Sequence, residues 1–160
     1  MSDAAGRFSE AAAAAGLAPD VRRFPEGTRT ADDAARAIGC DVGQIVKSLV
    51  FVAGNEAVLA LTSGRNRVDP AVLAALCGAS DARKATADEV RASTGYAIGG
   101  TPPFGHSSGL RCFGDPDLMA FDIVWAAAGT PDSVFPIAPE ELMRLAGAQV
   151  AGFTETRPGG

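Results

Sequence analysis

The chain has 160 residues, 47% of them hydrophobic and 21% charged, which is typical of a single globular domain with its own core. Its formal net charge of −5 argues against non-specific binding to nucleic acid, because such binding depends on neutralising phosphates. No apolar run approaches the ~20 residues of a membrane helix, and no secretory signal is evident at the start. The three cysteines form no CxxC pair. We therefore expect a cytoplasmic protein with reduced thiols, no membrane contact and no zinc site.

Helix and strand signals alternate along the chain. Cap residues and terminal glycines predict helices, the first of them a surface helix, at 7–15, 30–38, 70–77, 86–93 and from 139 onward. Runs of β-branched and aromatic residues predict strands at 21–24, 45–53, 56–62, 110–113, 121–127, 134–137 and 149–153. Because several strands are joined by short turns, the pattern predicts an α+β fold. We expect one domain over 1–160 with a mixed, largely antiparallel curved sheet flanked by short helices.

The clearest local feature is a β-hairpin that carries a lysine. The strand at 45–53 ends at Gly54-Asn55, a turn signal, and the chain returns as Val58-Leu59-Ala60-Leu61. Lys47 lies near the start of the first strand and is one of only two lysines, against twelve arginines. A lysine at a strand end is most often solvated. Lysine is nevertheless a compact point charge, so a ligand site can require it where arginine would not serve.

A glycine–proline loop follows about fifty residues later, at 97–106. Such a segment is most often a tight turn. Its bare backbone amides would also suit a phosphate or carboxylate held by a nearby cation. Four further basic residues can gather with Lys47 into a small patch: Arg65, Arg67, Arg83 and Lys84.

Several site classes are excluded. Lys47-Ser48 has no preceding GxxxxG, so it is not a P-loop, and Gly99-Gly100 lacks the GxGxxG spacing of a dinucleotide site. His106 is the only histidine, which rules out a multi-histidine metal centre, and no GxSxG elbow supports a serine triad. The remaining possibility is a site rich in backbone groups, in which N–H groups stabilise an oxyanion and the substrate supplies its own activating group.

The ordered motifs resemble the YbaK/ProX family of prolyl-tRNA editing domains. The resemblance covers about residues 28–153 and rests on two elements above all, the lysine strand and a GxxxP loop. The matching segments are Ile38-Gly39, Ile45-Val46-Lys47-Ser48-Leu49-Val50-Phe51, Val58-Leu59-Ala60-Leu61 with Gly64, Val68-Asp69, Thr94-Gly95-Tyr96, Ile98-Gly99-Gly100-Thr101-Pro102-Pro103-Phe104-Gly105 and Pro139-Glu140-Glu141-Leu142.

The resemblance implies a trans-acting hydrolase that removes a wrongly attached amino acid from the 3′ end of tRNA, chiefly tRNA for proline. Lys47 would hold the phosphate of the terminal adenosine. The backbone of the loop would position the ester and the attacking group, through Gly99, Gly100, Thr101 and Pro103. The family implies substrate assistance by the ribose 2′-hydroxyl, with no metal and no cofactor. A synthetase or an elongation factor is the expected partner protein.

We expect four further residues to bind the substrate: Phe51, Ile98, Phe104 and His106. One position departs from the family, whose loop often reads Gly-Gly-Val-Ser-Pro. Pro102 stands at the serine position and lacks both the hydroxyl and the backbone donor, so any role of that hydroxyl is lost or moves to Thr101. The amino acid removed stays open among alanine, cysteine, 2-aminobutyrate, serine and threonine.

Two other functions stay open at this point. A non-catalytic module on the same fold would bind a tRNA end or a synthetase without hydrolysis. A thiol-dependent enzyme would use Cys40, Cys77 or Cys112, although no histidine lies beside any of them in the sequence.

Overall fold

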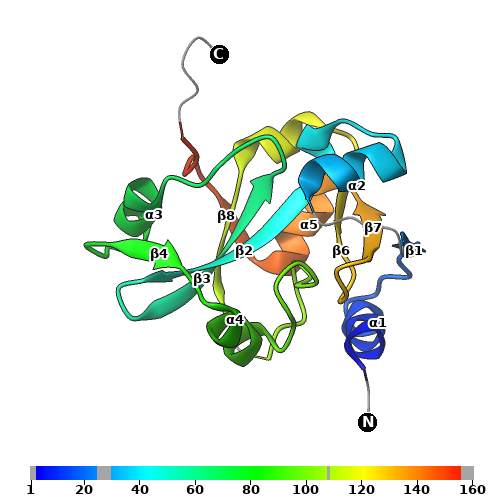
Figure 1. The fold of residues 1–160 in the computed structure, drawn as a ribbon, viewed down its shortest axis with the longest axis horizontal. Coiled ribbons are helices and arrows are strands. Elements are labelled where there is room, and N and C mark those ends of the chain that lie inside the picture. The colour runs from blue at the N-terminus through cyan, green and yellow to red at the C-terminus, as the bar shows by residue number, and fades with distance from the viewer. Residues whose placement is uncertain (1–2, 25–29, 108, 156–160) are drawn as a thin grey trace.

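The computed structural model describes residues 3–24, 30–107 and 109–155. Thr28, the expected start of the editing core, lies outside them. The strands form two sheets (Figure 1). One has the order β4-β2-β3-β5-β8, with β2 at Val46–Ala53, β3 at Glu56–Ser63, β4 at Ala82–Lys84, β5 at Arg111–Gly114 and β8 at Ala148–Val150. The other has the order β1-β7-β6, with β1 at Arg22–Arg23, β6 at Val124–Ala127 and β7 at Ser133–Ile137.

The predicted α+β fold with a mixed, largely antiparallel sheet is confirmed. β2 pairs antiparallel with β3 over its whole length, from Val46 opposite Ser63 to Ala53 opposite Glu56. The pairs β2–β4, β1–β7 and β6–β7 are also antiparallel, whereas β3–β5 and β5–β8 are parallel. The larger sheet is open, with β4 and β8 as its edge strands.

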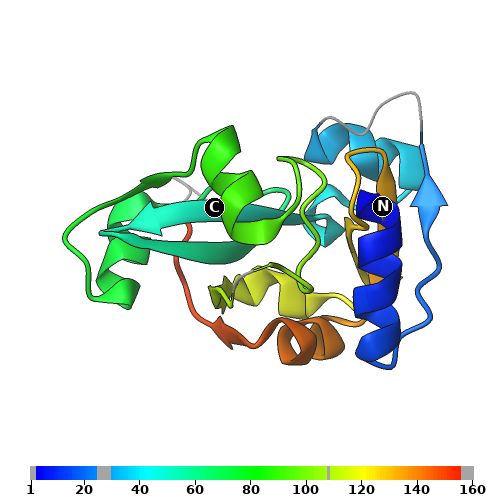
Figure 2. The ribbon, with the colours of Figure 1, turned by 90° about the horizontal axis from the view of Figure 1, so that it is seen from below.

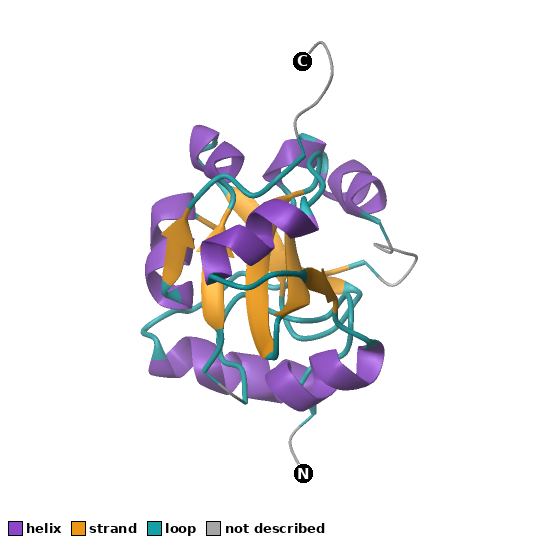
Figure 3. Cartoon of the chain, turned by 90° about the vertical axis from the view of Figure 1, so that its left-hand side faces the viewer, coloured by secondary structure: helices purple, strands orange, loops and turns teal. Residues whose placement is uncertain are grey.

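Five α-helices and two 3₁₀ helices surround the sheets in the described residues (Figure 3). Three of the predicted N-caps are confirmed by hydrogen bonds: Thr30 accepts from Asp33, Thr86 from Glu89, and Asp69 from Ala71. The helices are α1 at Ala4–Ala14, α2 at Ala31–Ile38, α3 at Pro70–Cys77, α4 at Ala87–Thr94, α5 at Pro139–Ala146, η1 at Val42–Gln44 and η2 at Pro116–Ala120.

Both faces of the larger sheet are buried, and its side chains alternate between two cores. Val50, Leu59 and Cys112 face a core that α1, α4, α5 and the smaller sheet complete. Phe51 and Val58 face the opposite way, into a core closed by α3 and the C-terminal segment. Because strand side chains alternate with a period of two, one strand serves both cores.

The structure differs from the sequence-based expectation in several elements, among them the two 3₁₀ helices, which are not predicted, and β8, which ends at Val150. The segment at 7–15 is predicted as a surface helix, but α1 begins at Ala4 and buries Phe8 and Ala12. Figure 2 shows this helix in blue alongside the smaller sheet, where Phe8 contacts Phe135 of β7. The strand predicted at 121–127 is shorter, since β6 begins only at Val124. The edge strand β4 is not predicted, because its three residues carry too little pattern to be recognised.

One edge of β2 stays open. β4 pairs only with Phe51–Ala53, and the next contact is a bond from the Ala85 N–H to the Val50 carbonyl. At the other end, an isolated bridge joins Ile45 to Trp125 of the smaller sheet. We call the stretch between these contacts, residues 46–49, the free edge of β2, because no strand of the described chain covers it. Among the described residues, no helix is long and apolar enough to cross a membrane.

Gly64 follows β3 at a point where the chain packs too closely for a side chain. A Cβ atom there would lie 2.9 Å from the Cβ of Ala31 and would also clash with the Val42 carbonyl oxygen. We expect Gly64→Ala to lower the free energy of unfolding by about 1–3 kcal/mol, measured by urea denaturation. Gly152→Ala is the matched control, because no atom lies within 4 Å of its added Cβ. Equal stability of the two variants would contradict this packing.

Candidate active site

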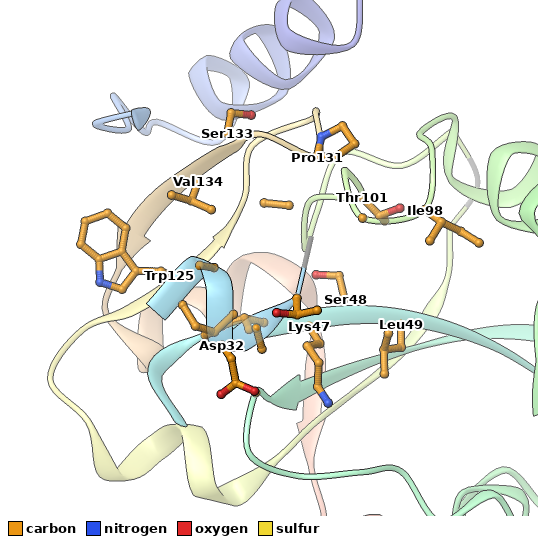
Figure 4. Close-up of a pocket in the computed structure, with 18 residues that line it drawn as sticks. Asp32, Lys47, Ser48, Leu49, Ile98, Thr101, Trp125, Pro131, Ser133 and Val134 are labelled. Carbon is orange, nitrogen blue, oxygen red and sulfur yellow. The ribbon is translucent and has the colours of Figure 1, made fainter. Parts of the chain in front are cut away.

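A cavity of about 440 Å³ lies along the free edge of β2 (Figure 4). Its walls come from segments distant in the sequence: the start of α2, the free edge itself, the glycine–proline loop and the smaller sheet. The lining residues are Thr30, Ala31, Asp32, Ala34, Ile45, Val46, Lys47, Ser48, Leu49, Gly64, Ile98, Gly99, Thr101, Trp125, Ala127, Pro131, Ser133 and Val134. The two sheets meet at the Ile45–Trp125 bridge, and beyond it the cavity separates β2 from β6.

Lys47 lines this cavity and is held by the loop that follows β3. Its Nζ atom donates a 2.6 Å hydrogen bond to the carbonyl oxygen of Asn66. In Figure 4 the side chain of Lys47 leaves one face of β2, and that of Ser48 leaves the other. An ammonium group carries three N–H donors, so it can bond to a backbone carbonyl and to a ligand at the same time.

A buried carboxylate in turn holds the loop that binds Lys47. Asp115 is 1% exposed and accepts hydrogen bonds from the Ser63 N–H at 3.0 Å and from the Asn66 side-chain amide at 2.8 Å. It also accepts from the backbone N–H of Asp117. The same Asn66 amide donates to the Asp117 carboxylate at 2.7 Å. Asp115 therefore anchors Asn66, whose carbonyl positions Lys47.

The glycine–proline loop covers the cavity with Ile98, Gly99 and Thr101. Gly99 has a φ of +85°, a left-handed conformation that favours glycine. A Cβ on Gly100 would lie 3.0 Å from the Gly129 carbonyl oxygen, so a bare backbone is needed for this contact. The Thr101 hydroxyl donates to the Ala97 carbonyl at 3.1 Å, which braces the loop internally.

The second half of the loop points away from the cavity. Phe104 is buried and stacks on Phe8 of α1, with ring centroids 5.7 Å apart, and it also contacts Phe135 of β7. Pro103, Phe104 and His106 instead line a separate hollow of about 320 Å³. The His106 Nε2 atom donates a 2.7 Å bond to the Pro102 carbonyl, since a carbonyl only accepts.

The structure thus brings together only some of the predicted site residues. Lys47, Ile98, Gly99 and Thr101 share the cavity, and Gly100 lies between the last two. Three predicted substrate-binding residues lie elsewhere, which corrects their placement. Phe51 faces the α3 core at 2% exposure, because its side chain leaves the face of β2 that packs against α3. Phe104 and His106 stabilise the loop through contacts outside the cavity. Pro103 lines the same separate hollow as these two residues.

The predicted basic patch is partly neutralised. Arg65 pairs with Asp41 at 2.5 Å, and Arg83 forms two hydrogen bonds with Glu89. These bonds hold the pKa of Glu89 at about 2. Lys47 is the cation among the lining residues of the main cavity, and Asp32 is the carboxylate.

None of the three cysteines, all within the described chain, lines the main cavity. Burial raises the pKa of Cys112 to about 12, and burial is also the main cause that raises the pKa of Cys40 and Cys77. Raised pKa values keep thiols protonated and poorly nucleophilic. These values therefore argue against a thiol-dependent enzyme.

Sequence reasoning missed five polar or aromatic lining residues: Thr30, Asp32, Ser48, Trp125 and Ser133. Of these, only Ser48 carried a local signal, since it follows Lys47 on a strand with an open edge. Trp125 is 9% exposed and forms part of the core with Val134. The described residues contain no group of three or more His, Cys, Asp or Glu that could hold a metal ion.

A lysine beside a free strand edge and a glycine loop suits a ligand that combines a phosphate with a small acyl group. The model of the aminoacyl-tRNA editing domain matches residues 25–145, so the chain belongs to this family.

Relatives and solved structures agree with this assignment. The uncharacterized protein YwhH of Bacillus subtilis is 31% identical over 132 residues, which cover 82% of this chain and 83% of that protein. EbsC of Enterococcus faecalis, named as a candidate Cys-tRNA(Pro)/Cys-tRNA(Cys) deacylase, is 28% identical and covers 82% of this chain and 80% of its own. A crystal structure described as a candidate trans-editing enzyme for prolyl tRNA synthetase is 47% identical. It matches with a TM-score of 0.91 over 98% of this chain and 99% of that one.

Asp115 satisfies three donors at once, so its removal leaves buried N–H groups without acceptors. We expect Asp115→Ala to lower the free energy of unfolding by about 2–3 kcal/mol, measured by urea denaturation. Asp117→Ala is the control, because that exposed side chain accepts only the second bond from Asn66, and its loss should cost below about 1 kcal/mol. Equal losses in the two variants would refute the anchoring role of Asp115.

His106 predicts a dependence of stability on pH. Burial lowers its pKa below the usual 6.5, outweighing the opposite effect of its bond to Pro102. The unfolded chain therefore binds a proton more readily than the folded one. The stability that the neutral ring contributes is fully present above pH 6.5 and is lost as the pH falls through the lowered pKa. We expect His106→Gln to flatten the decline of the unfolding free energy between pH 7 and 5. An unchanged slope would show that this histidine does not cause it.

Proposed function

We propose that this protein is a trans-acting deacylase that hydrolyses the ester of mischarged tRNA, with tRNA for proline as its chief substrate. The editing unit extends over about residues 28–153 within a single domain. The observation that carries the proposal is that Lys47 and the loop at Gly99 and Thr101, fifty residues apart, line one cavity at a free strand edge. Family membership, one relative named as a candidate deacylase and one solved structure described as a candidate trans-editing enzyme support the proposal.

Lys47 is the proposed anchor for the phosphate of the terminal adenosine. Its ammonium is held by the Asn66 carbonyl, and a compact point charge can approach a phosphate from several directions. With the phosphate bound there, the aminoacyl ester reaches along the free edge of β2 toward the loop. The backbone of Gly99, Gly100 and Thr101 then orients the ester carbonyl, as preorganised amide dipoles do in oxyanion sites.

The proposed reaction relies on the substrate for activation. The ribose 2′-hydroxyl beside the ester helps to orient and activate a water molecule. The water adds to the carbonyl carbon, the bond to the 3′-oxygen breaks, and that oxygen leaves as a hydroxyl, giving free amino acid and intact tRNA. An ester needs less assistance than an amide, because its leaving group is better. No step involves a cofactor or a metal.

Contact with the tRNA body and delivery of the substrate are further parts of the proposed function. With Arg65 and Arg83 already paired to carboxylates and a net charge of −5, contact with the tRNA body is expected to be weak. We therefore propose that a synthetase or an elongation factor delivers the mischarged tRNA in the cytoplasm.

The lysine provides the direct test. We expect Lys47→Ala to lower kcat/KM for deacylation of mischarged tRNA for proline by about 10- to 100-fold, the usual effect of losing a hydrogen bond to a charged group. Lys47→Arg should restore activity only in part, because a planar fork replaces a point charge. Arg91→Ala is the control, since that exposed residue lies on α4 and outside the cavity lining.

A thermal melt must accompany these assays. If the Lys47→Ala variant is unfolded, the lysine is needed for the fold and the loss of activity says nothing about ligand binding. Equal rates of ester loss with and without wild-type protein, at saturating binding, would favour a non-catalytic module that only binds the tRNA end.

A further inference from the structure

Ser48 is a residue whose polar atoms face the site with unused bonding capacity. Its Oγ atom is buried and has no hydrogen-bond partner within the part of the chain that the structure describes. A buried hydroxyl without a partner costs free energy, and proteins tend to retain such groups where a ligand completes them. Figure 4 places this hydroxyl at the cavity, on the face of β2 that meets the loop.

The backbone of Ser48 points to the same place. The Val50 carbonyl accepts from Ala85 on the β4 side of β2. Residues two apart on a strand direct their N–H and C=O groups to the same side, so those of Ser48 point outward as well. There the free edge has no strand partner in the described residues. One residue thus presents a hydroxyl, an N–H and a C=O to the cavity.

A side pocket of about 140 Å³ adjoins the main cavity at this residue. The two spaces share Ser48, Leu49, Ile98, Gly99 and Thr101. The walls of the side pocket are mainly aliphatic and include Val50 and Val90, both buried, while Lys84 is the charged residue among those that line it. Its size suits a short side chain.

The other hydroxyl on the wall is already in use. Thr101 donates its proton to the Ala97 carbonyl at 3.1 Å, so it braces the loop and does not replace the serine that Pro102 displaces. Ser48 is therefore the hydroxyl of this pocket with its donor still available.

We propose that the side pocket receives the side chain of the aminoacyl group and that the Ser48 hydroxyl binds a hydroxyl on it, so that the protein removes serine and threonine. This inference rests on the proposed deacylase function. Mainly aliphatic walls with one available hydroxyl match a side chain that is small and carries a single hydroxyl. Alanine and 2-aminobutyrate leave the Ser48 hydroxyl unpaired, and a site built to bind a hydroxyl discriminates against ligands that lack one. Cysteine offers only a weak bond.

Serine and 2-aminobutyrate form the decisive pair, because they have nearly the same size and differ in the hydroxyl. We would charge tRNA for proline with each and measure kcat/KM for deacylation by the wild type, Ser48→Ala and a control, Ser9→Ala, on the exposed surface of α1. The wild type should favour the seryl ester by about 10- to 100-fold. Ser48→Ala should reduce that ratio to about one by slowing seryl hydrolysis alone.

The melting temperature gives an independent readout. Since the Ser48 hydroxyl has no hydrogen-bond partner among the described residues, Ser48→Ala should melt at or above the wild-type temperature.

Two results would overturn the inference while leaving the deacylase intact: equal hydrolysis of the two esters by the wild type, or an equal loss on both esters in Ser48→Ala. Hydrolysis of neither ester by folded wild-type protein would overturn the proposed function and this inference with it.

Discussion

The free edge of β2 is the constraint on which the site depends. β3 pairs with the whole of β2, whereas β4 is three residues long and covers only its far end. If β4 extended further, its backbone would occupy the place of the cavity. Exposed strand edges are usually protected, because they present unpaired N–H and C=O groups. Here α2, the glycine–proline loop and the smaller sheet surround the edge without pairing with it, and this leaves an enclosed space with backbone donors and acceptors on its wall.

Two separate sets of contacts hold the groups that face this space. The loop is fixed from behind, where Phe104 packs between α1 and β7 and His106 bonds to Pro102. Lys47 is fixed from the opposite side through Asn66 and the buried carboxylate of Asp115. Residues remote from the cavity therefore set the geometry within it. This arrangement suits chemistry that depends on position more than on reactive side chains, as the proposed deacylation does.

Most of the fold could be predicted because its signals are local. The Gly54-Asn55 turn specified the hairpin, and the caps at Thr30, Asp69 and Thr86 marked helix starts that the structure confirms. Where local patterns were weak, prediction failed. β4 is too short to show a period, and an alanine-rich helix with one phenylalanine gave no sign that Phe8 joins the main core.

The sequence by itself determined most of the secondary structure, including the lysine strand and the glycine–proline loop, because these features depend on neighbours a few residues apart. Through its motifs it also indicated the family. Only the tertiary structure decided which residues face the cavity, because burial depends on what packs from elsewhere in the chain. An aromatic residue such as Phe104 has the same pattern whether it binds a ligand or fills a core. Ser48 became significant only once the strand edge, the loop and the Thr101–Ala97 bond were seen together, since an unsatisfied hydroxyl is a property of the folded surroundings.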